Sequence, residues 1–489
     1  MRALACVLLA ACAAPAPPPP RLPAHAADAA VAATVDAPAV PPVVDAAPGL
    51  TAADVAADLA TLRATLDALH PGLHRYVTPA ELDAAFAATA AALGDRPRVA
   101  DVYLALARLT ARLACGHTFP NPHNQSDAVA AAVLDGPRLP FAFRWIDGAM
   151  VITRAFVDDA RLAPGTRVRA IDGVADGDLL TRLLPLGRAD GSNRAKRLAS
   201  LEIHGGDRVE AFDIYLPLVA PTISPPYALK LVAPDGQVRQ IEVAAMSAAD
   251  RVAAAPDPAA TDDAPLWALT WLDATTAYLR MPTWVAYRTR WDWQADLDRT
   301  MAAVARRKGA RLIVDLRGNE GGSDVGDRIL AHVITRPIAA RGTERWVRYR
   351  AVPAALRPPL DTWDASFFDW GDDAIATADP AWFRLADEPG AATLAPARPR
   401  FRGKLVVLVD ASNSSATFQF AWRVQTLGLG TLIAGRRRTT PSRRPSRRCS
   451  ASASPPGSRR SATARSASSW RCGRRPRSTR WPPPSGSPR

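Results

Sequence analysis

The string LVVLVDASNSSATFQF, residues 405–420, puts a serine where it could act as a nucleophile. Its apolar half predicts a buried strand that ends at Asp410, and a short polar turn leads to a helix beginning near Ser415. The unpaired N–H groups and positive end of a helix favour a nucleophile whose intermediate is an anion. A serine at a helix start is more often only a cap, so this string alone leaves both roles open.

A second string, LIVDLRGNEGG at residues 312–322, is an apolar strand that runs into a glycine-rich turn. The turn is not a phosphate-binding loop, because no Gly-Lys-Ser/Thr follows, and it lacks the dinucleotide fingerprint. The adjacent Gly321 and Gly322 could present backbone N–H groups to a developing oxyanion. The alternative is a turn that only closes the strand.

A third string, LTARLACGHTFPNP at residues 109–122, offers a candidate general base. His117 follows Gly116 where an amphipathic helix ends and the chain turns. An isolated histidine is more often a surface residue or a satisfied core residue than a base. A serine, a histidine and oxyanion donors are nevertheless the parts that acyl transfer requires.

Together the strings resemble one family, the tail-specific or C-terminal processing serine peptidases. LIVDLRGNEGG is similar to that family's Asp-Leu-Arg-x-Asn-x-Gly-Gly strand and turn, and VLVDASNSSAT is similar to its nucleophile segment. HPGLHRY and CGHT resemble the branch that pairs its serine with a histidine from the N-terminal part. The resemblance covers about residues 50–435.

The resemblance implies a mechanism for this chain. His117 would take the proton of Ser415, which would attack a peptide carbonyl and form an acyl-enzyme. Backbone N–H groups near Gly321 or Gly322, with that of Ala416, would stabilise the tetrahedral oxygen. No cofactor is expected, and no Cys/His pattern predicts a metal site.

Two departures from the family pattern concern the residues that would assist Ser415. A Ser–Lys dyad with a downstream lysine is impossible, because the last lysine is Lys404 and arginine does not deprotonate. The Ser–His branch takes an orienting carboxylate from beyond the nucleophile helix, but no Asp or Glu follows Ser415. The third catalytic residue is therefore unassigned, and without one the rate is expected to fall by orders of magnitude.

The order of predicted elements agrees with the family's arrangement. Helices are expected from Thr51, from Thr78 and over about residues 99–114, because capping residues precede apolar positions at helical spacing. FAFRWIDGAMVITRAF then predicts two strands, and LAPGTRVRAIDGVADGDLLTRLL looks like the strand, turn and helix of a PDZ-type module, which binds peptides by strand addition. Strands alternate with helices after Pro265, apart from a long irregular stretch over 336–400.

The predicted fold class is α/β: a crotonase-like catalytic domain preceded by a small helical domain and a PDZ-like β-rich module. The predicted divisions are a lipoprotein-type signal peptide over 1–12, an Ala/Pro-rich tether over 13–49, the helical domain over 50–135, the PDZ-like module over 138–248, an incomplete catalytic domain over 262–435 and a tail over 436–489.

The N-terminal string MRALACVLLAAC predicts export. Its apolar run is too short for a stable membrane anchor, and Leu-Ala-Ala-Cys resembles the lipobox in which the cysteine, here Cys12, is acylated. A plain secretory signal cut nearby is the alternative. The interpretation favours a lipid-anchored protein of the bacterial cell envelope, on the periplasmic side or at the outer membrane.

The tail accounts for the basic charge of the chain. The formal net charge is +14, but 16 of the 61 basic residues are arginines in 436–489, which leaves 45 basic against 47 acidic residues. Every residue type in the tail has a codon with G or C in second place, as a shifted frame in GC-rich DNA would produce. We therefore expect a frame slip between Ile433 and Arg436. This interpretation is preferred to the two alternatives, an arm that binds RNA and an arm that binds anionic lipid.

The sequence thus predicts an exported serine endopeptidase with protein or peptide substrates, impaired or inactivated by an aberrant C-terminus. The alternative is a lipoprotein on the same scaffold that binds peptides or another ligand without cleaving them. No nucleic-acid partner is expected, because the body of the chain is near neutral and the protein is predicted to be exported.

Overall fold

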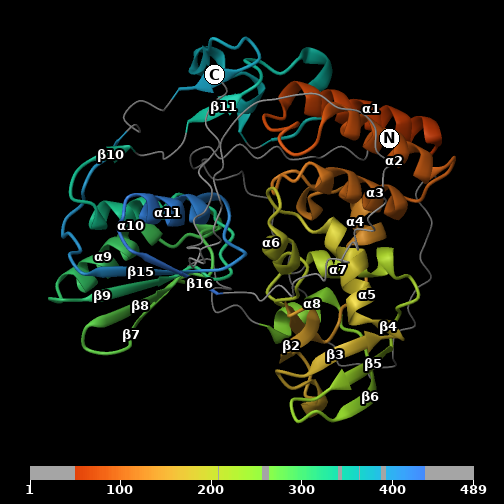
Figure 1. Cartoon of the computed structure of the whole chain (residues 1–489), viewed down its shortest axis with the longest axis horizontal. Coiled ribbons are helices and arrows are strands. Elements are labelled where there is room, and N and C mark those ends of the chain that lie inside the picture. The colour runs from red at the N-terminus through yellow and green to blue at the C-terminus, as the bar shows by residue number, and fades with distance from the viewer. Residues whose placement is uncertain are drawn as a thin grey trace, which may run out of the picture. The chain divides into compact units, whose positions relative to one another are not determined.

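The fold is described here from a computed structural model, which covers residues 50–435 except 208, 256–263, 340–343, 363 and 387–392. The predicted signal peptide with Cys12, the tether and the tail lie outside the described residues. Within the described part, no helix is both long and apolar enough to cross a membrane. The chain is a mixed α/β protein, with helices at its N-terminal end and two larger sheets after them (Figure 1).

The N-terminal part consists of helices α1 (Ala52–Leu69), α2 (Pro79–Leu93), α3 (Val99–Arg112) and α4 (Asp127–Val133). The predicted capping boxes are present: Thr51 and Thr78 each cap a helix together with the acidic residue at its third position. Helix α3 ends slightly earlier than the expected residue 114, because Ala114 adopts a left-handed conformation with φ +49°. His117 lies in the turn that follows this helix end.

The middle part is a six-stranded antiparallel sheet with four helices, which we call the β-rich module. Its strands are β1 (Phe141–Ile146), β2 (Ala149–Ala155), β3 (Arg167–Ile171), β4 (Val174–Ala175), β5 (Tyr227–Val232) and β6 (Val238–Val243), in the order β1-β2-β3-β5-β6 with β4 beside β3. Its helices are α5 (Asp176–Leu183), α6 (Arg194–Ala199), α7 (Ala211–Val219) and α8 (Ala248–Ala254). The hydrophobic core of this module also includes residues of α3 and α4.

The outer edge of strand β1 is partly covered by the module's own chain. The N–H of Phe143 donates to the carbonyl of Ile203 at 3.1 Å, and the N–H of Trp145 donates to Oε1 of Glu202 at 2.9 Å. The indole N–H of Trp145 also donates to the carbonyl of Leu201. At these two positions the edge therefore has no free donor for an added strand.

The last part is a five-stranded sheet with helices on it, which we call the C-terminal domain. The strand order is β16 (Thr431–Ala434), β15 (Lys404–Val409), β9 (Arg311–Asp315), β8 (Thr276–Arg280) and β7 (Ala268–Trp271), parallel except for β7. Helices α9 (Trp293–Ala305), α10 (Val325–Val333) and α11 (Ser415–Thr426) lie along it (Figure 1). Strands β9 and β15 are adjacent and parallel, so the turns after them meet at one edge of the sheet.

The stretch over 336–400 was expected to be irregular, but its described residues form small sheets. Strands β10 (Ile338–Ala339) and β14 (Thr393–Leu394) pair, and β11 (Arg345–Val347), β13 (Phe383–Leu385) and β12 (Ala374–Ala376) form a second sheet. Tyr349, Phe367 and Trp370 give this segment a core of its own, which also contains Leu69 at the end of α1. Strands of two or three residues are too short to show a period in the sequence.

Candidate active site

Asp315, at the end of strand β9, anchors the turn that follows it. Its buried carboxylate accepts hydrogen bonds from the hydroxyl of Tyr278 at 2.5 Å and from the backbone and guanidinium of Arg317 at 2.7–3.0 Å. Burial alone would raise the pKa of Asp315, but the bonds from Arg317 and Tyr278 outweigh it and lower the pKa to about 2. The Asp-Leu-Arg string therefore fixes the start of the glycine turn.

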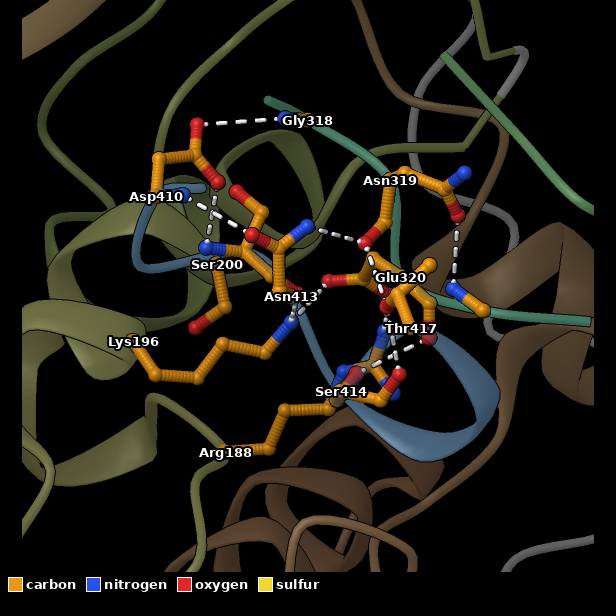
Figure 2. Close-up of polar contacts among 12 residues, drawn as sticks. Arg188, Lys196, Ser200, Gly318, Asn319, Glu320, Asp410, Asn413, Ser414 and Thr417 are labelled. Carbon is orange, nitrogen blue, oxygen red and sulfur yellow. Dashed lines mark hydrogen bonds and ion pairs between the residues drawn. The ribbon is translucent and has the colours of Figure 1, made fainter. Parts of the chain in front are cut away.

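The turns after β9 and β15 are joined by a network of hydrogen bonds, drawn in Figure 2. Asp410 accepts from the N–H of Gly318 at 3.1 Å, and the side-chain amide of Asn413 donates to the carbonyl of Asn319 at 2.9 Å. The hydroxyl of Thr417 donates to the same carbonyl at 3.1 Å. Because most partners are backbone atoms, the network holds the two main chains in a fixed relation.

Ser415 is the first residue of helix α11 and has a left-handed backbone with φ +50°. A positive φ is costly for a residue with a Cβ, and such strain occurs most often at functional positions. Gly321 lies directly against it: a Cβ added to Gly321 would be 2.9 Å from Cβ of Ser415 and 3.1 Å from the nitrogen of Ala416. The predicted nucleophile and two of the predicted oxyanion residues are thus in contact.

The neighbouring hydroxyl of Ser414 already has an acceptor. It donates to the carbonyl of Glu320 at 3.0 Å, as Figure 2 shows. Its Oγ therefore serves to join the helix start to the glycine turn. Of the two adjacent serines, Ser415 is the one whose strained backbone and contact with Gly321 match a nucleophile.

The predicted oxyanion residues Gly321, Gly322 and Ala416 have different surroundings. The N–H of Gly321 donates to Oδ1 of Asn319 at 2.9 Å, so as an oxyanion donor it would have to exchange this bond. Gly322 lies against the carbonyl of Trp284, which leaves no space for a side chain. Ala416 lies in the first turn of α11, where N–H groups have no partner within the helix.

Three charged residues join the β-rich module to the glycine turn. Lys196, on α6, donates from Nζ to the carbonyl of Ser412 at 2.6 Å and pairs with Oε1 of Glu320. Arg188 donates to Oε2 of the same carboxylate at 2.7 Å (Figure 2). Desolvation alone would raise the pKa of Glu320, but the Arg188 and Lys196 charges hold it below its usual value. Burial lowers the pKa of Lys196, and Glu320 opposes that shift.

His117 lies in the turn after α3, beside this group of charges. Burial lowers the pKa of His117, while the charges of Asp190 and Glu320 oppose that shift and those of Arg188 and Lys196 add to it. The structure thus brings His117 within electrostatic range of the residues that contact the glycine turn. Its imidazole makes no hydrogen bond to any residue that the structure describes, so proton transfer from Ser415 would require the ring to move.

In the described part of the chain, no group of three or more His, Cys, Asp or Glu residues is arranged to hold a metal ion. The parts that are present, a serine at a helix start, a histidine and backbone donors, suit nucleophilic acyl transfer.

The C-terminal part of the chain matches a known peptidase family. Residues 275–448 match the model of peptidase family S41. This part of the chain is a domain of peptidase family S41, a family of serine-type hydrolases. The matched residues contain both the glycine turn and Ser415, whereas His117 and Lys196 lie outside them.

One of the similar solved structures shares the fold of this chain. A single-residue mutant of CPAF matches with a TM-score of 0.52 and 13% identity over 78% of this chain and 83% of its own. The photosystem II D1 C-terminal processing protease matches with a TM-score of 0.31 and 15% identity over 76% of this chain and 79% of its own. No curated protein is significantly similar in sequence. At 13% identity the likeness to CPAF concerns the fold alone.

Three polar side chains at the candidate site were not found from the sequence: Arg188, Lys196 and Asp190. Lys196 is separated from Glu320 by 124 residues and from Ser412 by 216, so no local spacing could indicate the contact. Glu320 lies within the quoted glycine string, and a charged residue between Asn319 and Gly321 was the one signal available.

Proposed function

We propose that the chain is an exported serine endopeptidase that hydrolyses peptide bonds through an acyl-enzyme. In this proposal the C-terminal domain is crotonase-like and the β-rich module is PDZ-like. The observation that carries the proposal is the contact of Gly321 with Ser415 and the nitrogen of Ala416, at a serine whose φ is positive. This arrangement puts a strained nucleophile beside backbone donors at a helix start.

The proposed reaction uses His117 as the general base and then as the general acid. The proton of the Ser415 hydroxyl passes to the imidazole while Oγ bonds to the carbonyl carbon of the substrate. The resulting oxyanion is stabilised by N–H groups of the glycine pair and of Ala416. The C–N bond then breaks as the imidazolium returns the proton to the leaving amine, and a water molecule releases the acid product by the same two steps.

Substitution of Ser415 tests the proposal. Ser415→Ala should lower peptide hydrolysis and labelling by a fluorophosphonate by about four orders of magnitude or more. Ser414→Ala is the matched control, because it removes a hydroxyl one residue away that donates to the carbonyl of Glu320. Its labelling should stay within about tenfold of the parent. Equal labelling of Ser415→Ala and the parent would exclude Ser415 as the nucleophile.

Non-catalytic peptide binding is the competing function on the same scaffold. Strand addition needs an open edge, but the N–H groups of Phe143 and Trp145 on β1 already have partners within the module. This arrangement disfavours peptide binding at that edge. Peptide affinity that survives Ser415→Ala, with no turnover by the parent, would favour the binding protein.

Export and lipid attachment at Cys12 are part of the proposal, with proteins or peptides of the bacterial cell envelope as substrates. A Cys12→Ala chain should lose incorporation of labelled fatty acid and leave the membrane fraction. Attachment that persists in Cys12→Ala would exclude this anchor.

The composition of residues 436–489 supports a frame slip as the origin of the tail and of the missing acid after Ser415. The nucleotide sequence around Ile433 is the test. An alternative frame should restore aliphatic and acidic residues, and activity should rise in the restored chain. If all frames lack such residues, the tail belongs to the protein.

A further inference from the structure

The turn that carries His117 is held by a loop of the β-rich module. Three contacts join residues 114–119 to residues 188–191. The N–H of Gly191 donates to the carbonyl of Ala114 at 2.8 Å, and the guanidinium of Arg188 lies 4.5 Å from the ring centre of Phe119. The loop therefore contacts the chain on both sides of His117.

The third contact places a carboxylate beside His117. Oδ1 of Asp190 accepts the N–H of Gly116 at 2.9 Å. A Cβ at Gly116 would be 3.0 Å from Oδ2 of Asp190, so the glycine allows the carboxylate to approach the backbone this closely. Ala114, whose carbonyl bonds to Gly191, is one of four described non-glycine residues with a positive φ, and Ser415 is another. Strained backbone thus occurs three residues before the base and at the nucleophile itself.

The two carboxylates near His117 differ in their other partners. The charges of Asp190, Glu320, Arg188 and Lys196 all influence the imidazole. Glu320 is paired with both cations, which offset its charge. No cation lies within ion-pair distance of Asp190 among the residues that the structure describes. Its charge is therefore the one available to an imidazolium at position 117.

On the basis of the proposed function, we propose that Asp190 is the positioning residue of His117. It anchors the turn through Gly116 and supplies the negative charge that the imidazolium needs during acyl transfer. The carboxylate remains ionised and takes no proton. The β-rich module would then contribute to catalysis directly, through a loop that contacts the base.

Asp190→Asn separates the charge from the contact, because the amide oxygen can still accept the N–H of Gly116. The matched control is Asp235→Asn, in which the native carboxylate likewise accepts a backbone N–H in an exposed turn, that of Gln237. The chain has seven histidines, so the imidazole signal of His117 in a ¹⁵N-histidine-labelled protein is assigned with His117→Gln. The protonation of each variant is followed by NMR across pH.

The charge that Asp190 supplies favours the imidazolium, so its loss should lower the pKa of His117. Asp190→Asn should therefore shift the titration of His117 to lower pH, while Asp235→Asn and the charge-retaining Asp190→Glu should leave it near that of the parent. An unchanged titration in Asp190→Asn, or an equal shift in Asp235→Asn, overturns the proposal.

The rate of fluorophosphonate labelling at Ser415 provides the second readout. In Asp190→Asn the maximal labelling rate should fall about fivefold, the effect of one charge acting across solvent at contact distance. The acid side of the pH–rate profile should also move to lower pH, because His117 would lose its proton at lower pH. A contact with only a structural role would lower the labelling rate without shifting the pH–rate profile. A shifted titration with unchanged labelling would overturn the positioning role. Absence of labelling in both the parent and the frame-restored chain would refute the proposed function itself, and the titration would still decide whether Asp190 is the charged neighbour of His117.

Discussion

The nucleophile and the base of the proposed catalytic pair are held by different kinds of contact. Around Ser415, two turns of one domain are joined by backbone and amide hydrogen bonds, and Gly321 packs directly on the serine. Around His117, the contacts come from a loop of another part of the chain: the carboxylate of Asp190, the guanidinium of Arg188 and the N–H of Gly191. The nucleophile side is therefore fixed by steric fit, and the base side by charge.

The largest effect should come from filling the space between Gly321 and Ser415. Gly321→Ala puts a methyl group 2.9 Å from Cβ of Ser415 at φ +111°, so the backbone must move. Labelling at Ser415 should fall about a hundredfold, because small displacements of reacting groups have effects of this size. The control is Gly318→Ala in the same turn, where φ is +85° but the space is open, so only about 1–2 kcal/mol of strain is added. Equal rates in the two variants would show that steric fit does not govern the nucleophile side.

The next effect concerns the buried cation between the two sides. Lys196→Met removes the ammonium from the carbonyl of Ser412 and from Glu320, and the labelling rate should fall about tenfold, the factor for one charged hydrogen bond. Lys230→Met, at an exposed lysine of β5, should leave the rate unchanged. A rate equal to that of the parent in Lys196→Met would mean that the glycine turn does not need the β-rich module.

Loss of the second cation should matter less. Arg188 and Glu320 form a partly exposed pair, with side chains 35% and 45% exposed, and such pairs contribute little. Arg188→Met should therefore lower the labelling rate by about threefold or less, and added salt should reduce the difference from the parent. A larger loss than in Lys196→Met would reverse the order that burial predicts.

The smallest effect should appear in stability at low pH. The pKa of Asp315 is lowered to about 2 from its ordinary value of 3.8, so its ionised form stabilises the fold above pH 3.8 and this stabilisation is lost as pH falls through about 2. Asp315→Asn should cost about 1–2 kcal/mol of unfolding free energy at pH 5 and almost nothing near pH 2, measured by urea denaturation. Asp178→Asn, at an exposed carboxylate, is the control. If Asp315→Asn lost as much at pH 2 as at pH 5, the effect would come from packing.

The same contrast explains what the sequence could reveal. An apolar strand, a glycine pair and a helix-start serine are local patterns, and adjacent parallel strands bring them together, so Gly321 and Ser415 could be predicted as neighbours. His117 could be singled out only through a family resemblance. Asp190 and Lys196 gave no signal, because their partners are 74 or more residues away and side-chain charge has no sequence period.

Elements longer than one turn were also easier to predict than short ones. The capped helices α1 and α2 begin where their Thr residues indicate. The small sheets within 336–400 were missed because their strands have two or three residues. The predicted end of α3, at about residue 114, was too far along the chain, because alanine is an ordinary helix former and nothing in the sequence indicates the left-handed backbone of Ala114.

The ion pairs of Glu320 have a thermodynamic consequence. Glu320 is bound by Arg188 and Lys196 of the β-rich module, and it immediately precedes Gly321. If these pairs raise the affinity of the site for an inhibitor by some factor, then bound inhibitor must strengthen the docking of the module by the same factor. Inhibitor binding and docking of the module are therefore coupled through the same peptide segment, so a change in either one changes the free energy of the other.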